Sequence, residues 1–472
     1  MKKTSLERFL LLPINTFINK QTSVGVLIII SSILAMIVAN SPYAEYYHAI
    51  WRQHLYIGYN DAVLNKTVLH WINDGLMSIF FFMVGLELKR EVMSGELSNF
   101  RSAILPVVAA IGGMIFPALI FFYFNFDLDS IKGWGIPMAT DIAFALGVLY
   151  LLGNRVPLSL KIFLTAIAVI DDLGAILVVA FFYTSDIMLN NLAMGGVFLL
   201  VLIIANFIGI RNPIFYAIAG IGGLWMAIML SGVHATIAAV LAAFAIPTSK
   251  KINTPLFLRK VKMLSYEIKE KLKSKNLNEN KTEDEVTNLI EKFSLLSQDA
   301  TPPLQRLEYS LHSLVSFIIL PIFAFANAGV TIDSSSFNNL FSNLAIGVIL
   351  GLLIGKFVGI VLFTRLMVYF KISKLPPNVN WKHVYGIGFL GAMGFTMSLF
   401  ITDLAYDNEL FLTQAKIGIL SASTIAGIIG YFYLRYITRK NTKKIVFKII
   451  SKSTSVDLEN KEYFIKNPVQ KN

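Results

Sequence analysis

Long apolar runs separated by short polar segments dominate this sequence. A helix needs about 20 consecutive apolar residues to cross a hydrocarbon core about 30 Å thick. The pattern predicts an all-α integral membrane protein with twelve transmembrane helices, the first eight within residues 23–247 and the last four within 307–437. The predicted helices occupy residues 23–40, 68–86, 103–124, 134–152, 158–182, 192–210, 214–230, 232–247, 310–330, 341–364, 383–405 and 412–434.

The Lys and Arg residues of the loops indicate how these helices are oriented. One set of loops, including residues 250–281, and both chain ends are rich in them. The opposite loops hold only Arg52, Lys66, Lys132 and Lys416. Because basic loops stay cytoplasmic, we expect both termini inside the cell, which requires an even number of crossings. Residues 1–22 are then a cytoplasmic segment, since Pro13 interrupts an apolar run too short for a signal peptide, and residues 438–472 form a cytoplasmic tail.

Two longer polar segments interrupt the apolar pattern. Residues 41–67 form an external loop rich in aromatic side chains, which is either a hairpin that meets another subunit or an aromatic belt at the membrane interface. Residues 248–306 form a long cytoplasmic loop with an amphipathic helix, which a capping-box pattern at Thr282–Glu285 is expected to start. The apolar face of that helix consists of Val286, Leu289, Ile290, Phe293 and Leu296.

Composition excludes several classes of protein. Of the 472 residues, 55% are hydrophobic and 15% are charged, which is too apolar for a soluble protein of this size. The sequence contains no cysteine, so disulfides, thiol nucleophiles and Cys-ligated metals are excluded. The net charge of +12 is typical of basic cytoplasmic loops in a membrane protein and does not indicate nucleic-acid binding.

Two adjacent carboxylates, Asp171 and Asp172, interrupt the apolar run 162–183. Asp171 lies nine residues past Ile162. That spacing places it about 14 Å along the helix, near the middle of the bilayer. A charge at this depth costs several kcal/mol, so it requires a partner, a proton or a bound ion. We interpret the pair as a functional site; the alternative is a structural pair hydrogen-bonded to neighbouring helices.

Two of the predicted helices have sequences that do not suit a continuous helix. In the run 134–152, Pro137 removes a backbone donor, and Thr140 and Asp141 place polar side chains inside the membrane. The glycines of the run 383–405 weaken that helix, although they would also suit close helix packing. This second run contains Gly386, Gly388, Gly391 and Gly394, followed by Thr396 and Ser398.

The positions of these two helices predict an internal repeat. Each is the middle helix of a triplet, 103–182 or 341–434, and the loop charges give the two triplets opposite orientations. Interrupted helices at matching places in oppositely oriented halves indicate an inverted-topology repeat with a binding site at mid-membrane.

Lys356 is a further charge near mid-depth, in the run 341–364, where it cannot easily reach the interface. Broken helices expose N–H ends with partial positive charge and C=O ends with partial negative charge. We therefore assign Asp141 to the N-terminal ends and Lys356 to the C-terminal ends. Lys356 is also a candidate ion-pair partner for Asp171; a purely structural ion pair is the alternative.

Paired carboxylates suit the exchange of a cation for protons. Oxygen ligands select hard cations such as Na⁺ or Li⁺. Neighbouring like charges disfavour ionisation of both groups, so the same oxygens can hold protons or a cation. Competition between the two is sufficient for exchange, and two protons moved for one monovalent cation would carry net charge across the membrane.

Seven segments between residues 13 and 440 resemble the NhaA family of Na⁺/H⁺ antiporters. They are FFMVGLELKREVMSGEL (81–97), MATDIAFALG (138–147), NRVPLSLKIFLTAIAVIDDLGAI (154–176), SGVHATIAAV (231–240), FAFANAGV (323–330), LLIGKFVGI (352–360) and GFLGAMGFTMSLFI (388–401). The resemblance implies a multi-pass protein of the bacterial inner membrane that expels Na⁺ or Li⁺ in exchange for protons. It also implies electrogenic, pH-regulated transport that serves pH homeostasis and salt tolerance, without enzymatic activity or a cofactor.

The resemblance also assigns roles to individual residues. Asp171 and Asp172 match the cation and proton site, Thr140 and Asp141 the unwound segment beside it, and Lys356 the intramembrane lysine. The residues that match positions linked to pH activation are Glu87, Arg90, Glu91 and Glu308 near the cytoplasm, and His234 at the outer end of the eighth helix.

Other parts of the resemblance are less direct. A lone histidine at a helix end, such as His234, is more often structural. Family members are dimers bridged through the first external loop, so a homodimer through residues 45–58 is expected. The loop 248–306 is longer than in the compact family pattern, and it abuts Glu308.

Two other functions deserve comparison with antiport. A Na⁺-coupled symporter of an organic anion could use the same scaffold of broken helices. An intramembrane aspartyl protease also has Asp in membrane helices, but with one Asp on each of two helices and typically a Gly-x-Gly-Asp signature. Here the two Asp are adjacent on one helix and that signature is absent.

Overall fold

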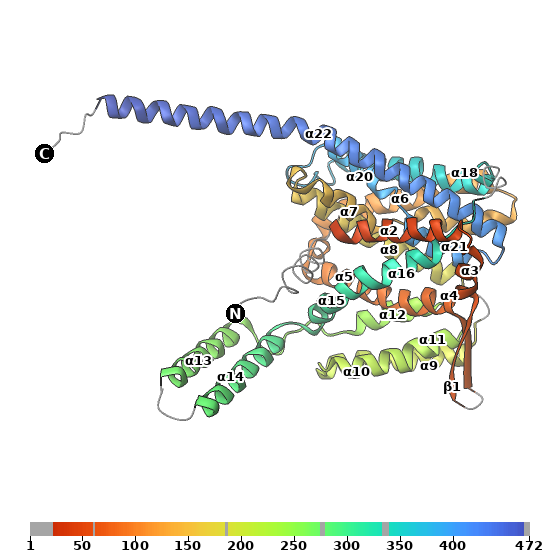
Figure 1. Cartoon of the computed structure of the whole chain (residues 1–472), viewed down its shortest axis with the longest axis horizontal. Helices are drawn as coiled ribbons and strands as arrows, with labels where there is room; N and C mark the ends of the chain where they lie inside the picture. The colour runs from red at the N-terminus through yellow and green to blue at the C-terminus, as the bar shows by residue number, and fades with distance from the viewer. Residues whose placement is uncertain (1–21, 60–61, 185–186, 274–278, 333–338, 467–472) are drawn as a thin grey trace.

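The computed structural model describes residues 22–59, 62–184, 187–273, 279–332 and 339–466. Most of the described chain is helical, and the long helices lie side by side in one bundle (Figure 1). The predicted N-terminal segment 1–22 lies outside the described residues except for its last position.

The elements follow the predicted apolar runs, with η marking short 3₁₀ or π-helical segments. The first part of the chain forms α2 (Thr22–Ala39), α3 (Ala44–Arg52), β1 (His54–Tyr59), β2 (Ala62–Thr67), α4 (Val68–His70), η2 (Trp71–Leu76), α5 (Met77–Ser94), η3 (Glu96–Ser98), α6 (Phe100–Asn125), η4 (Asp129–Met138), α7 (Ile142–Leu151), η5 (Gly153–Arg155), α8 (Leu158–Phe182), α9 (Leu189–Ile208), α10 (Pro213–Ala217), η6 (Ile218–Trp225), α11 (Met226–Leu230) and α12 (Ala235–Ala245). The second part forms α13 (Thr254–Lys273), α14 (Glu279–Ala300), α15 (Pro303–Leu314), η7 (Val315–Ile319), α16 (Leu320–Asn327), α18 (Asn343–Leu350), η8 (Gly351–Lys356), α19 (Phe357–Tyr369), α20 (Trp381–Gly391), α21 (Phe395–Ala405) and α22 (Glu409–Lys466).

Among the described residues, eight helices are long and apolar enough to cross a membrane, or up to eleven if each bent pair counts as one span. The bent pairs are α2 with α3, η4 with α7, and α20 with α21. Each predicted apolar run contains helix, and the run 232–247 contains the short α12. The structure is therefore that of a multi-pass helical membrane protein, while the count of twelve crossings stays a prediction.

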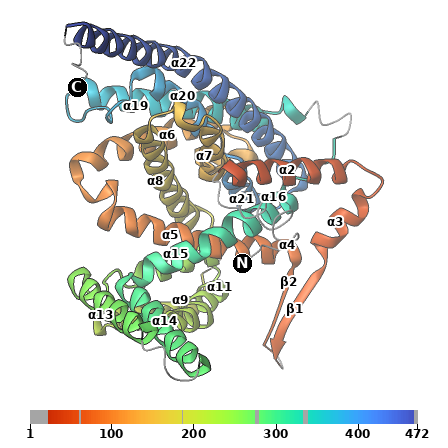
Figure 2. The same ribbon diagram turned by 60° about the vertical axis from the view of Figure 1, so that its left-hand side comes forward.

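The loop 41–67 contains a hairpin, the structure expected in one of its two interpretations, while its contact with another subunit stays a prediction. Strands β1 and β2 pair antiparallel, with His54 opposite Thr67 and Tyr59 opposite Ala62. Figure 2 shows the hairpin extending away from the helical bundle. The chain enters it through α3, where Tyr47 is buried and its hydroxyl donates to the carbonyl of Phe325 over 2.6 Å.

In the long loop 248–306, the predicted start of the amphipathic helix at Thr282 is wrong. The loop holds two helices, α13 and α14, which contact each other and lie apart from the main bundle (Figure 1). Helix α14 begins at Glu279, so Thr282 lies inside the helix and does not cap it. The Glu and Lys residues before Thr282 favour helix, which allows the helix to start earlier. Of its predicted apolar face, Leu289 and Leu296 are buried, whereas Ile290 and Phe293 are exposed.

The last helix is longer than its apolar run. Helix α22 continues from Glu409 to Lys466, through most of the predicted tail 438–472, and Figure 1 shows its second half leaving the bundle. The sequence offers no Gly or Pro between Gly430 and Pro468, so no strong helix breaker stops it earlier.

Glycines let two helices near the bundle centre approach closely. Helices α6 and α19 lie against each other, and a Cβ added at Gly112 or at Gly359 would collide with the backbone of the other glycine. Small residues at such crossings are a usual means of helix association in membranes. Gly113 continues the contact, because a Cβ there would lie 3.0 Å from Ile360.

We predict that Gly359→Val destabilises the protein, because two helix backbones would have to separate. Overpacking of this kind costs about 1–3 kcal/mol. Thermal unfolding of the purified protein in detergent measures the effect. The matched control is Gly196→Val on α9, where an added Cβ meets nothing within 4 Å. Equal unfolding temperatures for the two variants would contradict the proposed packing role.

Candidate ion-binding site

Helix α8 carries Asp171 and Asp172 at its middle, among apolar residues that face neighbouring helices. Asp171 is 1% exposed and Asp172 is 0% exposed. The surrounding turns, from Ile167 to Ile176, are mostly buried as well. The pair therefore lies inside the bundle and not on the surface that would face lipid.

Both helices that were predicted to be interrupted are broken beside this pair. The chain leaves helical geometry at residues 139–141, where η4 and α7 meet at 41°, and at 392–394, where α20 and α21 meet at 40°. Pro137 lies just before the first break, and because it has no backbone N–H, it favours an interruption of the helix there. The breaks touch directly, because the N–H of Asp141 donates to the carbonyl of Met393 over 2.7 Å.

Asp141 links the helices that begin after the two breaks. One carboxylate oxygen accepts the N–H of Phe144 at the start of α7, over 2.9 Å. The other oxygen accepts two hydrogen bonds from Thr396 at the start of α21, from its N–H over 3.0 Å and from its side-chain hydroxyl over 2.5 Å. A carboxylate at two helix N-termini is favourable, because unpaired N–H groups and the helix dipoles both present positive charge there.

Lys356 lies at the end of the π-helical segment η8 and is fully buried. Its ammonium group forms an ion pair with Asp171 and donates to the hydroxyl of Thr140 over 2.7 Å. The Thr140 oxygen also lies 2.7 Å from Asp171 and 3.0 Å from the carbonyl of Gly391 at the C-terminal end of α20. Since a hydroxyl has one proton, Thr140 can donate to only one of these acceptors at a time.

Asp172 differs from the other buried charges. Among the residues that the structure describes, neither of its carboxylate oxygens has a hydrogen-bond partner, and one oxygen of Asp171 is also unpartnered. Buried polar atoms without partners are rare, and an isolated ionised carboxylate is strongly unfavourable in an apolar interior. Three unpartnered oxygens on adjacent residues therefore form a place where a proton or a small cation is required.

A second group of charges gathers near the C-terminal end of α5. Arg90 forms ion pairs with Glu308 over 3.0 Å and with Glu91 over 2.8 Å. Glu87 lies one helical turn before Glu91 and is partly buried, with no hydrogen bond to its side chain among the described residues. His234 belongs to neither group, since its ring nitrogen lies 2.8 Å from the carbonyl of Tyr183.

Three polar residues around the breaks were not among the predicted site residues. Thr396 completes the environment of Asp141, Ser398 donates to the carbonyl of Ile136 over 2.8 Å, and Ser423 of α22 accepts the N–H of Phe395 over 3.1 Å. Thr396 and Ser398 follow the glycine-rich run directly, and this position could have indicated them. Ser423 has no comparable sequence signal.

Within the described part of the chain, no group of three or more His, Cys, Asp or Glu side chains gathers as metal ligands. The bundle instead surrounds two helix breaks, an ion pair and an incompletely neutralised carboxylate. This arrangement defines a membrane transport protein for small ions, since ionisable residues inside membranes mark ion pathways and broken helices mark the sites of transporters.

Comparison with known proteins identifies the family. The sequence profile of the family described as Na⁺/H⁺ antiporter 1 matches residues 15–434. A protein of Oleidesulfovibrio alaskensis named Na⁺/H⁺ antiporter NhaA is 45% identical over 430 residues, which cover 91% of this chain and 95% of that protein. Na⁺/H⁺ antiporter NhaA 1 of Saccharophagus degradans is 44% identical over 433 residues, 90% of this chain and 91% of that protein.

This chain belongs to the Na⁺/H⁺ antiporter 1 family, so the resemblance to NhaA proteins is confirmed. It is a multi-pass bacterial membrane protein of a family whose members exchange cations and protons. The names of its relatives are those of transporters and not of enzymes.

We predict that Lys356→Ala destabilises the protein by about 3–5 kcal/mol, since it leaves Asp171 buried without its partner. The variant must keep Asp171 protonated when folded, whereas the unfolded chain releases that proton at neutral pH. The loss of stability relative to wild type should therefore grow as the pH rises. Thermal unfolding in detergent between pH 6 and 9 measures it.

The double variant Lys356→Ala/Asp171→Asn is the control for this experiment. Because an amide needs no proton, it should remove the added pH dependence. An unchanged unfolding temperature of Lys356→Ala at every pH would show that the ion pair does not support the fold.

Proposed function

We propose that this protein exports Na⁺ or Li⁺ from the cytoplasm in exchange for external protons, by competition of cation and protons for Asp171 and Asp172. The observation that carries the proposal is the pair of unpartnered oxygens on fully buried Asp172. The family of the chain supports Na⁺ and protons as the transported ions. Na⁺ and Li⁺ are both hard cations that prefer oxygen ligands, so the carboxylates suit either ion.

The two aspartates would contribute differently. Successive residues on a helix diverge by about 100°, so they do not present their oxygens to one point equally. Asp172 ligates the cation, while Asp171 exchanges its ion pair with Lys356 for a proton or a share of the cation. Release of two protons for one monovalent cation makes the cycle electrogenic.

The broken helices support an inverted repeat as the frame of this exchange. Along the chain, η4 and α7 come between α6 and α8, and α20 and α21 come between α19 and α22. Asp141 and the Asp141–Met393 hydrogen bond join the two breaks. Movement of one half against the other would then change the side from which Asp172 is reached.

The orientation and assembly of the protein are also part of the proposal. The loop charges support an inner-membrane protein of twelve crossings with both termini in the cytoplasm. The β1–β2 hairpin, which extends from the bundle, supports a homodimer formed through residues 45–58 (Figure 2).

The cluster of Arg90 with Glu91 and Glu308 supports regulation by pH, with Glu87 as its fourth member. Arg90 connects α5 to α15, and α5 lies against α8 and α12 in the bundle. A change in protonation of these carboxylates would alter how α5 and α15 are held together. His234, on the other side of the bundle, is a separate candidate for a response to external pH.

We predict that Asp172→Asn abolishes exchange, because an amide can neither release a proton nor supply a charged ligand. In everted vesicles with a preformed proton gradient, Na⁺ should collapse the gradient for wild type and not for the variant. Asp129→Asn, at the exposed first residue of η4, is the matched control and should exchange at the wild-type rate.

A variant lacking both carboxylates, Asp171→Asn/Asp172→Asn, that exchanged at the wild-type rate would overturn the proposal. The same assay separates the alternative symporter, because Na⁺ alone would then leave the proton gradient intact and an organic anion would be needed. The family comparison does not favour that alternative.

We predict that Glu308→Gln moves the pH of half-maximal exchange to lower values by a fraction of a unit, with little change in the maximal rate. One negative charge fewer then opposes the release of a proton from Glu87. Exchange measured from pH 6 to 9 tests this. Lys251→Gln, which breaks the Lys251–Asp299 ion pair in the long loop, should leave the profile unchanged.

A further inference from the structure

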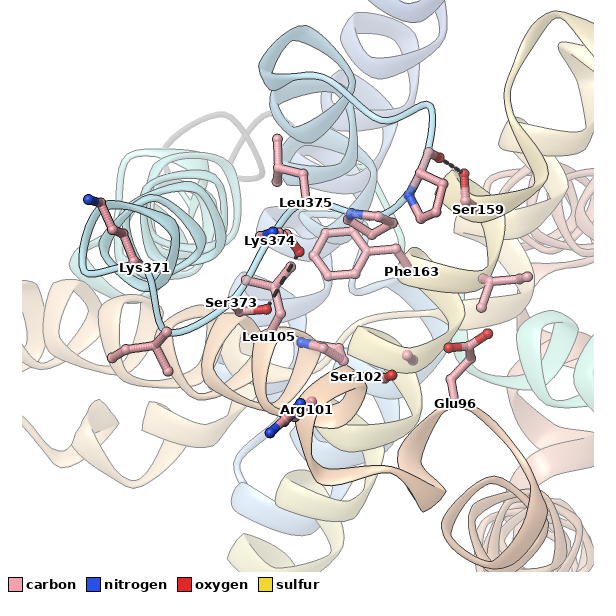
Figure 3. A pocket seen from close by; sticks show the side chains of 16 residues that line it. Glu96, Arg101, Ser102, Leu105, Ser159, Phe163, Lys371, Ser373, Lys374 and Leu375 are labelled. Carbon is pink, nitrogen blue, oxygen red and sulfur yellow. Dashed lines mark hydrogen bonds between the residues drawn. The ribbon is translucent and has the colours of Figure 1, made fainter.

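A hollow of about 490 Å³ lies where α6 and α8 begin and the α19–α20 linker passes over them. Figure 3 shows Arg101 and Ser102 of α6 on one side of it and Ser373 and Lys374 of the linker on another, with Phe163 of α8 between them. We call it the basic pocket. Neither the proposed exchange site nor the Arg90 cluster uses it.

The depth of the basic pocket is that of lipid headgroups. Arg101 is the second residue of α6, Ser159 is the second residue of α8, and Lys371 follows the end of α19 by two residues. All three helices are membrane spans or parts of one. The ends of spanning helices lie at the boundary between hydrocarbon and headgroups, so the pocket opens at that level.

The charges of the pocket favour an anion. Its lining includes Arg101, Lys371 and Lys374 against a single carboxylate, Glu96. All four side chains belong to exposed residues, and none of the three cations forms an ion pair within the described part of the chain. The hydroxyl of Ser102 adds a hydrogen-bond donor that a phosphate oxygen could accept.

The floor and rim of the pocket are apolar. Leu105, Pro106 and Phe163 are buried at its base. Of its apolar lining, Ile372 is 57% exposed and Ile162 is 37% exposed. Phe100 and Leu158, the chain neighbours of the lining residues Arg101 and Ser159, are 78% and 70% exposed. Large apolar side chains this exposed require a hydrocarbon environment, so the mouth faces the bilayer and not only water.

We propose that the basic pocket binds an anionic phospholipid of the leaflet that the loop charges place on the cytoplasmic side. The phosphate would lie between Arg101 and Lys374, and an acyl chain would lie along the exposed apolar rim. Basic pockets between spanning helices on this side of a membrane suit anionic headgroups. A soluble anion would use the cations but leave the apolar rim without a role.

A lipid in this pocket would connect elements that hold the exchange site. It would bridge the start of α6 to the α19–α20 linker. Helix α19 directly follows Lys356, and α20 is the first half of a broken helix. It would also contact α8 at Phe163 and Ala166, the latter five residues before Asp171. The bound lipid therefore stabilises the folded protein, and this effect does not depend on the proposed transport activity.

The test is thermal unfolding of the purified full-length protein in detergent with added lipid. Phosphatidylglycerol should raise the unfolding temperature of wild type by several degrees, and phosphatidylcholine of the same chain length should raise it much less. In Arg101→Gln/Lys374→Gln, phosphatidylglycerol should lose at least half of its effect. Native mass spectrometry should show fewer bound phosphatidylglycerol molecules on that variant.

The matched control is Lys250→Gln/Arg439→Gln, which removes two exposed cations that do not line the pocket. It should keep the wild-type response. If Arg101→Gln/Lys374→Gln fails to fold, Lys371→Glu in the exposed linker provides the same comparison. Equal stabilisation by phosphatidylcholine, stabilisation by inorganic phosphate alone, or an undiminished response of the pocket variants would each overturn the proposal.

Discussion

The cost of burying charge in a membrane is the constraint on which this structure depends. Asp141, Asp171, Asp172 and Lys356 are each at most 1% exposed. Lys356 neutralises Asp171, and the N-termini of α7 and α21 compensate Asp141. Asp172 alone has no such partner among the described residues. The fold thus compensates every buried charge in this group except one, and that exception makes the site responsive to a proton or cation.

The helix breaks are a consequence of the same constraint. A continuous helix satisfies its own N–H groups and could offer none to Asp141. Interrupting both helices frees N–H groups for the carboxylate and places Thr140 against the Gly391 carbonyl. Lys356 reaches this point from a π-helical turn, a geometry common at functional sites. Close contact of α6 with α19 holds that turn in place, since Gly113 lies against the Lys356 side chain.

Sequence indicated the features that depend on local chemistry and missed those that depend on distant contacts. Adjacent Asp in an apolar run and Pro137 are unusual in a membrane span, and the glycine-rich run occupies the matching place in the second triplet, so α8 and both breaks could be predicted. The bond between Thr396 and Asp141 joins residues 255 positions apart, and no local pattern encodes it. The capping-box expectation at Thr282 was wrong because that motif also occurs inside helices whose upstream residues favour helix. Helices α3 and α13 are too polar to stand out by hydropathy.

The two ends of α8 are held differently. At the C-terminal end, the hydroxyl of Tyr183 donates to the carbonyl of Lys132 over 2.7 Å and accepts the N–H of Gly135, which fastens η4 to α8. At the N-terminal end, α8 borders two hollows, the basic pocket and a second one of about 430 Å³, and Ile162 and Ala166 line both. The N-terminal end of α8 is therefore less closely packed by protein than its C-terminal end. A lipid in the basic pocket would fill the first hollow and leave the second, which Glu91 lines.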